Sequence, residues 1–132
     1  MTLRLTLKPG EGVLIGNSRV EVAGRGISVL LVDGDEPVLR TDYAVESIET
    51  GDVFGQIRMI LQQMYLCKNV IKYHEDYFNS IGALLNETPS ALTYVNQLNK
   101  YLMIGDVFSA IKFARDYSID PDARTGARLE AS

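Results

Sequence analysis

The sequence predicts an α+β protein, in which a small antiparallel β-barrel or sandwich is followed by an antiparallel bundle of about four helices. Over the first 43 residues, apolar side chains alternate with polar ones and glycine turns are frequent, which is typical of short strands. After residue 43 the apolar residues recur at helical spacing. We therefore expect a β-rich part over residues 1–43 and a helical part over residues 44–132.

The composition is that of one folded domain or two small parts that share a core. The chain has 132 residues, is 46% hydrophobic and 23% charged, and carries a formal charge of −4 at pH 7. This acidic balance excludes nucleic-acid binding by bulk positive charge, so any such activity needs a local basic patch. A single cysteine permits no internal disulfide, and neither a signal-peptide core nor a long apolar run is present. These features predict a cytoplasmic protein.

The β-rich part is expected to contain five short strands separated by turns. In the first strand, leucine alternates strictly with polar residues, which predicts a half-buried strand. The apolar run 27–32 has the β-branched and leucine content of a strand that is buried on both faces. The expected strands occupy residues 2–8, 13–15, 20–22, 27–32 and 38–40.

The helical part contains recognisable helix starts and ends. Thr88 followed by Pro89 is a favourable helix start, Gly105 predicts the end of that helix, and Asp106 can cap the next. Residues from Ile119 onward have few apolar anchors and are expected to be loose. The expected helices span about 52–66, 69–85, 88–104 and 106–117. The third should turn four apolar residues inward: Leu92, Val95, Leu98 and Leu102.

Patterns that carry catalysis or metal binding are weak. A zinc site or a nucleophile pair would require Cys67 and His74 to meet, and both are interpreted as ordinary helix residues. The segment Asp33–Asp35 lacks the spacing of a calcium loop and is read as a turn. No serine lies in a nucleophile-elbow motif. The sequence therefore predicts a protein that is not an enzyme and that needs neither a metal nor another cofactor.

Two groups of residues are candidates for binding. Arg4, Thr6 and Lys8 share the strand face opposite the leucines, and such a face can be merely solvated or can bind single-stranded RNA through phosphate contacts and polar contacts to bases. Tyr94 and Tyr101 lie seven residues apart on the third expected helix. They are either residues at the edge of the core or anchors in a protein interface.

The order of several segments resembles known families. The opening LTLKPGEGVLIGNSRVEV and the later VLR are similar to the small RNA-binding barrels of the carbon-storage-regulator (CsrA) family. The ordered set LRLTLKPGE, VLR, MYL, a YF-rich helix and YLMIGDVFSAIKFARD resembles the FlbT family of flagellar biosynthesis regulators. This second resemblance extends over residues 3–117.

The FlbT resemblance implies a bacterial post-transcriptional regulator that binds the 5′ leader of flagellin mRNA and represses its translation, alongside FlaF. The CsrA resemblance implies a CsrA-like β-subdomain, in which RNA lies against the first strand of one subunit and the last strand of its mate. Together with the exposed strand edges, it predicts a homodimer. By position it selects four RNA-contact candidates: Arg4, Thr6, Lys8 and Arg40.

A protein-binding adaptor remains the alternative. In that case the helical half, with Tyr94 and Tyr101 as candidate contacts, engages FlaF or flagellin, and the protein does not bind RNA directly. The acidic balance of the chain and the tyrosine and methionine content of residues 54–117 favour this alternative.

Overall fold

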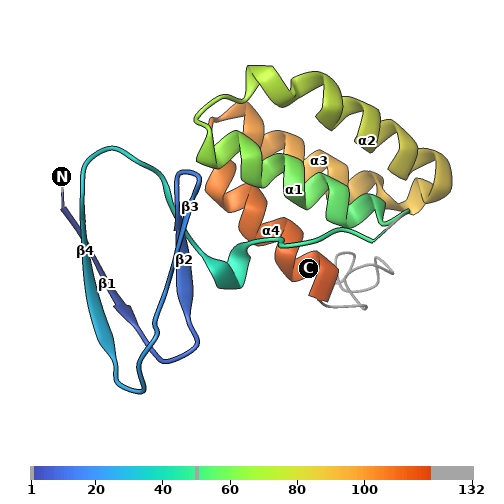
Figure 1. The fold of residues 1–132 in the computed structure, drawn as a ribbon. Helices are drawn as coiled ribbons and strands as arrows, with labels where there is room; N and C mark the ends of the chain where they lie inside the picture. The colour runs from blue at the N-terminus through green and yellow to red at the C-terminus, as the bar shows by residue number, and fades with distance from the viewer. Residues whose placement is uncertain (1, 50, 120–132) are drawn as a thin grey trace.

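The structure, a computed structural model, describes residues 2–49 and 51–119 and confirms the α+β class. Within these residues, antiparallel strands form two separate sheets and are followed by four α-helices. The strands form one side of the molecule and the helices the other (Figure 1). The sheets do not close into a barrel. The sequence predicts a loose C-terminal segment from Ile119 onward, and residues 120–132 of that segment lie outside the described residues.

The five strands follow the expected positions to within a few residues. β1 (Thr2–Leu7) pairs with β4 (Ser28–Asp33) as an antiparallel two-stranded ribbon. In the second sheet, β2 (Gly12–Ile15) lies between β3 (Ser18–Glu21) and β5 (Val38–Arg40). The β2–β3 hairpin is therefore inserted, in sequence, between the two strands of the β1–β4 ribbon.

The prediction that residues 27–32 are buried on both faces is wrong. Ile27, Val29 and Leu31 are 67%, 52% and 64% exposed, whereas Leu30 and Val32 face a small cluster formed with β1 and β2. Among residues 2–49 and 51–119, the rest of the chain covers only one face of the β1–β4 ribbon. The sequence does not reveal which face is exposed, because apolar residues occupy both odd- and even-numbered positions of this strand. Alternation is visible only where one face of a strand is polar.

The helices begin and end close to their signals in the sequence. Their bounds are α1 (Val53–Leu66), α2 (His74–Glu87), α3 (Leu92–Met103) and α4 (Val107–Ile119). At the start of α1, the Asp52 carboxylate accepts a hydrogen bond from the Gly55 N–H at 3.0 Å. At the start of α4, Asp106 accepts one from the Ser109 N–H at 3.1 Å. Gly105, with a φ of +80°, ends α3 in the left-handed region that favours glycine.

Two expected helices are shorter at their starts. The chain over residues 69–85 first forms a 3-10 turn (Ile71–Tyr73) and becomes α-helical only at His74. Likewise Pro89–Ala91 is a 3-10 turn, and the Thr88 side chain makes no capping hydrogen bond. Because α3 begins at Leu92, that residue sits in the first turn and is exposed rather than inward-facing.

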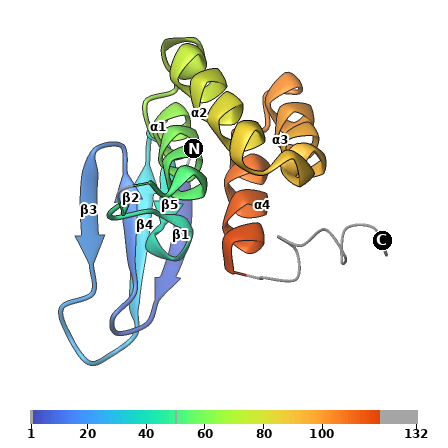
Figure 2. The same ribbon diagram turned by 90° about the vertical axis from the view of Figure 1, so that its right-hand side faces the viewer.

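The helices pack as an open arrangement around α1 and α4. α1 packs against α2 and α4, and α3 packs against α4; Figure 2 shows these helices from the side. α2 and α3 are joined by a hydrogen bond from the Tyr77 hydroxyl to Asn99 Oδ1 at 2.8 Å. No helix among residues 2–49 and 51–119 is both long enough and apolar enough to cross a membrane.

The strand half is anchored in the helical core through β5. Leu39 is fully buried among the core residues of the helices, and Leu14 of β2 packs against the same cluster. The Tyr65 hydroxyl of α1 donates to the Val38 carbonyl at 3.1 Å. The strands end at Arg40 and α1 begins at Val53, so the division of the chain at residue 43 stays a prediction, and the two parts share packing across it.

Candidate nucleic-acid interface

One face of the β1–β4 ribbon brings three of the RNA-contact candidates into a row. In an antiparallel pair, directly opposed residues point to the same side of the sheet. Arg4 is opposite Leu31 and Thr6 is opposite Val29. Lys8 and Ile27 follow one residue beyond the last pair and are exposed. We call this surface the outer face; its members are Arg4, Thr6, Lys8, Ile27, Val29 and Leu31.

Arg40 reaches the same strand from the other sheet. It is half-buried at the end of β5, and its Nη1 donates a hydrogen bond to the Thr6 carbonyl at 3.4 Å. The guanidinium therefore lies against the backbone of β1. The structure thus brings all four sequence-predicted RNA contacts, three of which carry positive charge, to a single strand.

Most other cations near the junction of the two halves are neutralised by carboxylates. Arg19 forms ion pairs with Glu21 and Glu46, whose carboxylates raise the pKa of its guanidinium, that of Glu46 most strongly. Arg115 of α4 binds Asp42 at 3.0 Å and also packs over the ring of Tyr43.

By contrast, the cations of the candidate site are not paired in this way. Arg4, Lys8 and Arg40 form no ion pair with the part of the chain that the structure describes. The nearest carboxylate contact involves the main-chain N–H of Lys8, which donates to Glu11 Oε1 at 2.6 Å and leaves the ammonium group unengaged. Asp42, two residues after Arg40, is bound by Arg115. The three cations are therefore available to an external anion.

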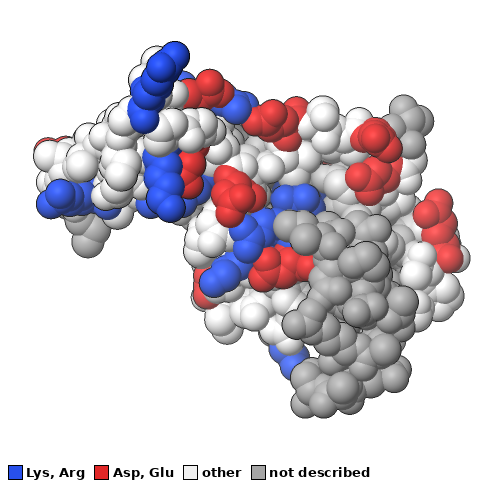
Figure 3. Space-filling model, turned by 90° about the horizontal axis from the view of Figure 1, so that it is seen from below, with Lys and Arg blue, Asp and Glu red and all other residues white. Residues whose placement is uncertain are grey.

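The charge distribution differs between the outer face and the cleft at the junction of the two halves. Figure 3 shows basic and acidic side chains interspersed on this side of the molecule, both over the strand half and towards the helices. A polar cleft of about 410 Å³ at the junction is lined by side chains of both signs, the bases Arg19 and Arg40 and the acids Glu11, Asp42 and Glu46. Since carboxylates repel phosphate, the outer face, whose charged side chains are Arg4 and Lys8, is a better surface for a polyanion than this cleft.

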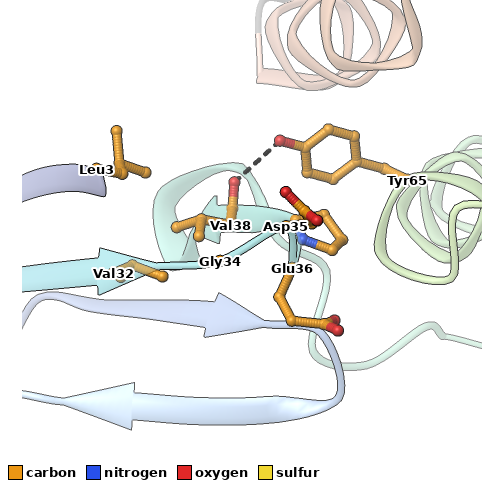
Figure 4. A pocket seen from close by; sticks show the side chains of 8 residues that line it. Leu3, Val32, Gly34, Asp35, Glu36, Val38 and Tyr65 are labelled. Atoms are coloured by element: carbon orange, nitrogen blue, oxygen red, sulfur yellow. Dashed lines mark hydrogen bonds between the residues drawn. The ribbon is translucent and has the colours of Figure 1, made fainter. Parts of the chain in front are cut away.

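A second hollow lies on the opposite face of the ribbon and was not anticipated from the sequence. It has a volume of about 350 Å³ and lies between the ribbon and Tyr65 of α1 (Figure 4). Leu3 and Val32 line it, together with Asp35 and Glu36 from the turn that follows β4. The only signal in the sequence was the acidic turn itself, which is also typical of an ordinary hairpin. Its carboxylates make this face unsuitable for RNA.

A third hollow, also not anticipated, lies between α2 and α3. Its volume is about 320 Å³, and it is lined mainly by apolar residues, among them Phe78 and Met103, which are 50% and 86% exposed. The Tyr77–Asn99 hydrogen bond lies at this groove. Burial raises the pKa of Tyr77 to about 12, so its hydroxyl stays protonated and can donate at neutral pH.

The two tyrosines selected as protein contacts occupy different environments. Tyr94 has no exposed surface and packs against the rings of Phe54, Phe113 and Tyr117. Its ring therefore belongs to the helical core. Tyr101 is half-buried, and its ring approaches that of Phe113. Only Tyr101 presents surface to a partner.

Cys67 and His74 do not form a joint site. The Cys67 sulfur contacts Gln63 Oε1 and the Tyr73 hydroxyl, both at 3.6 Å, while the His74 ring packs on Phe78 with ring centroids 4.6 Å apart. Across residues 2–49 and 51–119, no cluster of three or more histidine, cysteine, aspartate or glutamate side chains could hold a metal ion.

Comparison with known proteins places the chain among flagellar proteins. Residues 3–119 match the family described as flagellar protein FlbT. The chain is 29% identical over 117 residues to the "Probable flagellum biosynthesis repressor protein FlbT 1" of Bradyrhizobium diazoefficiens, covering 87% of this chain and 79% of that protein. It is 27% identical over 115 residues to the "Probable flagellum biosynthesis repressor protein FlbT" of Rhodopseudomonas palustris strain TIE-1, covering 87% and 90%. No solved structure matches.

Proposed function

Because the chain belongs to the FlbT family, we propose that it represses flagellum biosynthesis in the cytoplasm by binding the 5′ leader of flagellin mRNA and blocking its translation. Two relatives named as flagellum biosynthesis repressors support the regulatory part of this proposal. The RNA-binding part rests on one observation, which is the grouping of Arg4, Lys8 and Arg40 along β1 without carboxylate partners. Such a repressor acts by occupying the message, so it requires neither a catalytic step nor a cofactor.

The site favours an unpaired segment of RNA. Arg4 and Lys8 project from an exposed, two-stranded surface, which an extended strand can follow. A duplex would instead present its phosphates as two separated rows and keep its bases stacked inside. An unpaired leader leaves both the phosphates and the bases free to contact the outer face.

The experiment that tests RNA binding is a salt-titrated mobility shift with a flagellin 5′ leader. Three phosphate contacts give a log–log dependence of affinity on salt with a slope of roughly −2, at about −0.7 for each contact. Arg4→Ala should weaken binding and make the slope shallower by about 0.7. Lys100→Ala, which removes an exposed cation from α3, is the matched control and should bind as the wild type does. Binding that is absent at low salt, or equal in both variants, contradicts the proposal.

We also propose that the protein acts as a homodimer. Among the described residues, no third strand pairs with β1 or β4, although Arg40 contacts the Thr6 carbonyl of β1, and the second sheet ends at β3 and β5. Open strand edges pair readily with another chain. Sedimentation at micromolar concentration should show a species of twice 14.6 kDa, and a single 14.6 kDa species contradicts dimerisation.

A second candidate function is that of an adaptor, favoured by the apolar groove between α2 and α3. Grooves of this kind accept the apolar face of a partner helix. In this case the intact protein binds FlaF or flagellin, and a Phe78→Ser, Met103→Ser double variant does not. Binding that persists in the double variant removes the groove from consideration. If the intact protein ignores leader RNA at low salt and the groove variant loses its protein partner, the adaptor replaces the RNA-binding repressor.

A further inference from the structure

The outer face carries a feature that phosphate contacts alone do not explain. Beside the polar and basic side chains of β1 and Lys8 runs a row of three aliphatic side chains, Val29 and Leu31 on β4 and Ile27 just before it. All three are more than half exposed. A simply solvated strand would carry polar residues at these positions, because exposing contiguous aliphatic surface to water is unfavourable.

The two rows have the same repeat. Alternate residues of a strand are about 6.6–6.8 Å apart, and neighbouring strands are about 4.8 Å apart. The outer face is therefore a short ladder, in which Arg4 stands beside Leu31 and Thr6 beside Val29, and Lys8 and Ile27 extend it by one step. Each step joins a polar or cationic group to an aliphatic one.

An extended single-stranded polynucleotide has a matching repeat. Its successive phosphates are spaced similarly to alternate residues of a strand, and each phosphate is accompanied by a flat base with an apolar surface. Unstacked bases can lie on a sheet while the phosphates contact basic side chains at its margin. We propose that Ile27, Val29 and Leu31 form a base platform, on which three consecutive unpaired bases lie while β1 holds their phosphates.

This inference rests on the proposed RNA-binding function and adds the mode of recognition. Contact with aliphatic side chains reads the face of a base rather than its hydrogen-bonding edge, so the platform selects unpaired RNA without selecting its sequence. A second copy of the chain fits the outer face less well, because the two charged side chains along its β1 row are both cations and would meet like charges.

The test compares two probes, hexauridine and an abasic oligomer of the same length that retains the sugar–phosphate chain. The wild type should bind hexauridine about tenfold more tightly than the abasic oligomer, because only the former can cover the platform. An Ile27→Ser, Val29→Ser, Leu31→Ser variant should lose this preference and keep the salt slope. An Arg4→Ala, Lys8→Ala variant should bind both probes more weakly, with a slope shallower by about 1.4, and keep the preference.

Two controls keep the result independent of folding. Ile71→Ser removes an aliphatic side chain that is 85% exposed on the helical half and should bind as the wild type does. In the unmodified protein, methyl resonances of Ile27, Val29 and Leu31 should shift when hexauridine is added, while those of Ile71 should not.

Failure of the platform and failure of RNA binding are separate outcomes. If the wild type binds both probes equally, or if the triple serine variant keeps the preference, the platform is refuted while RNA binding by the cations stands. If the wild type binds neither probe at low salt, RNA binding itself is refuted and the aliphatic row is left for a protein contact.

Discussion

Replacing Leu39 with alanine tests whether the strand half and the helices unfold as one unit. Leu39 belongs to β5 but is fully buried in the helical core. Truncating a buried leucine removes its contacts and leaves a cavity, which costs about 3 kcal/mol of unfolding free energy in typical cores. For a chain of this size, a loss of that magnitude lowers the melting temperature by roughly 10 °C.

Thermal unfolding followed by far-ultraviolet circular dichroism measures this effect, because the signal is dominated by the helices. The helical signal of Leu39→Ala should melt in a single transition at the lower temperature. The matched control is Leu31→Ala, which truncates the same side chain where it is 64% exposed and should change the unfolding free energy by no more than about 0.5 kcal/mol. Helices that melt at the wild-type temperature in Leu39→Ala would show that the two halves are energetically independent.

Three further changes probe single interactions. Tyr65→Phe removes the hydrogen bond from α1 to the Val38 carbonyl of β5 at 3.1 Å and should lower the unfolding free energy, measured in urea, by about 1 kcal/mol. An unchanged urea midpoint would show that this bond does not stabilise the contact between β5 and the helices. Gln62→Leu leaves the Val45 N–H, bonded at 2.7 Å, without its partner and should lower the unfolding free energy by about 2 kcal/mol in the same assay; an unchanged midpoint contradicts this prediction. Hydrogen bonds from the Ser109 hydroxyl and N–H lower the pKa of Asp106. The ionised carboxylate therefore stabilises the folded protein above about pH 4, and this contribution disappears as pH falls through the lowered pKa. The melting temperatures of wild type and Asp106→Asn should differ at neutral pH and converge in acid, and a difference that does not change with pH contradicts the assignment.

The helix boundaries were predictable because their signals are local. Asp52 and Asp106 cap helices through side-chain oxygens, and Gly105 adopts a positive φ, all within a few residues of the boundary. Thr88 was less informative, because the 3-10 turn that follows it forms without a capping hydrogen bond from the Thr88 side chain.

Burial was less predictable, because it depends on which elements cover a residue. Tyr94 and Tyr101 occupy equivalent positions along α3, yet only Tyr94 is enclosed by rings from α1 and α4. In β4 the apolar pattern is continuous, and the open side of the ribbon follows from the tertiary arrangement alone. The alignment of Arg4, Thr6 and Lys8 could be predicted from strand periodicity, whereas the approach of Arg40 to β1 required the packing of two sheets.

The exposed aliphatic row also bears on how the protein behaves when no ligand is present. An apolar strand surface beside an open edge promotes intermolecular sheet formation, and charged neighbours oppose it. Arg4 and Lys8 are placed to keep the outer faces of unliganded molecules apart by mutual repulsion. Variants that remove both cations are therefore expected to aggregate at lower concentrations than the wild type, so their purification and storage call for dilute, cold conditions.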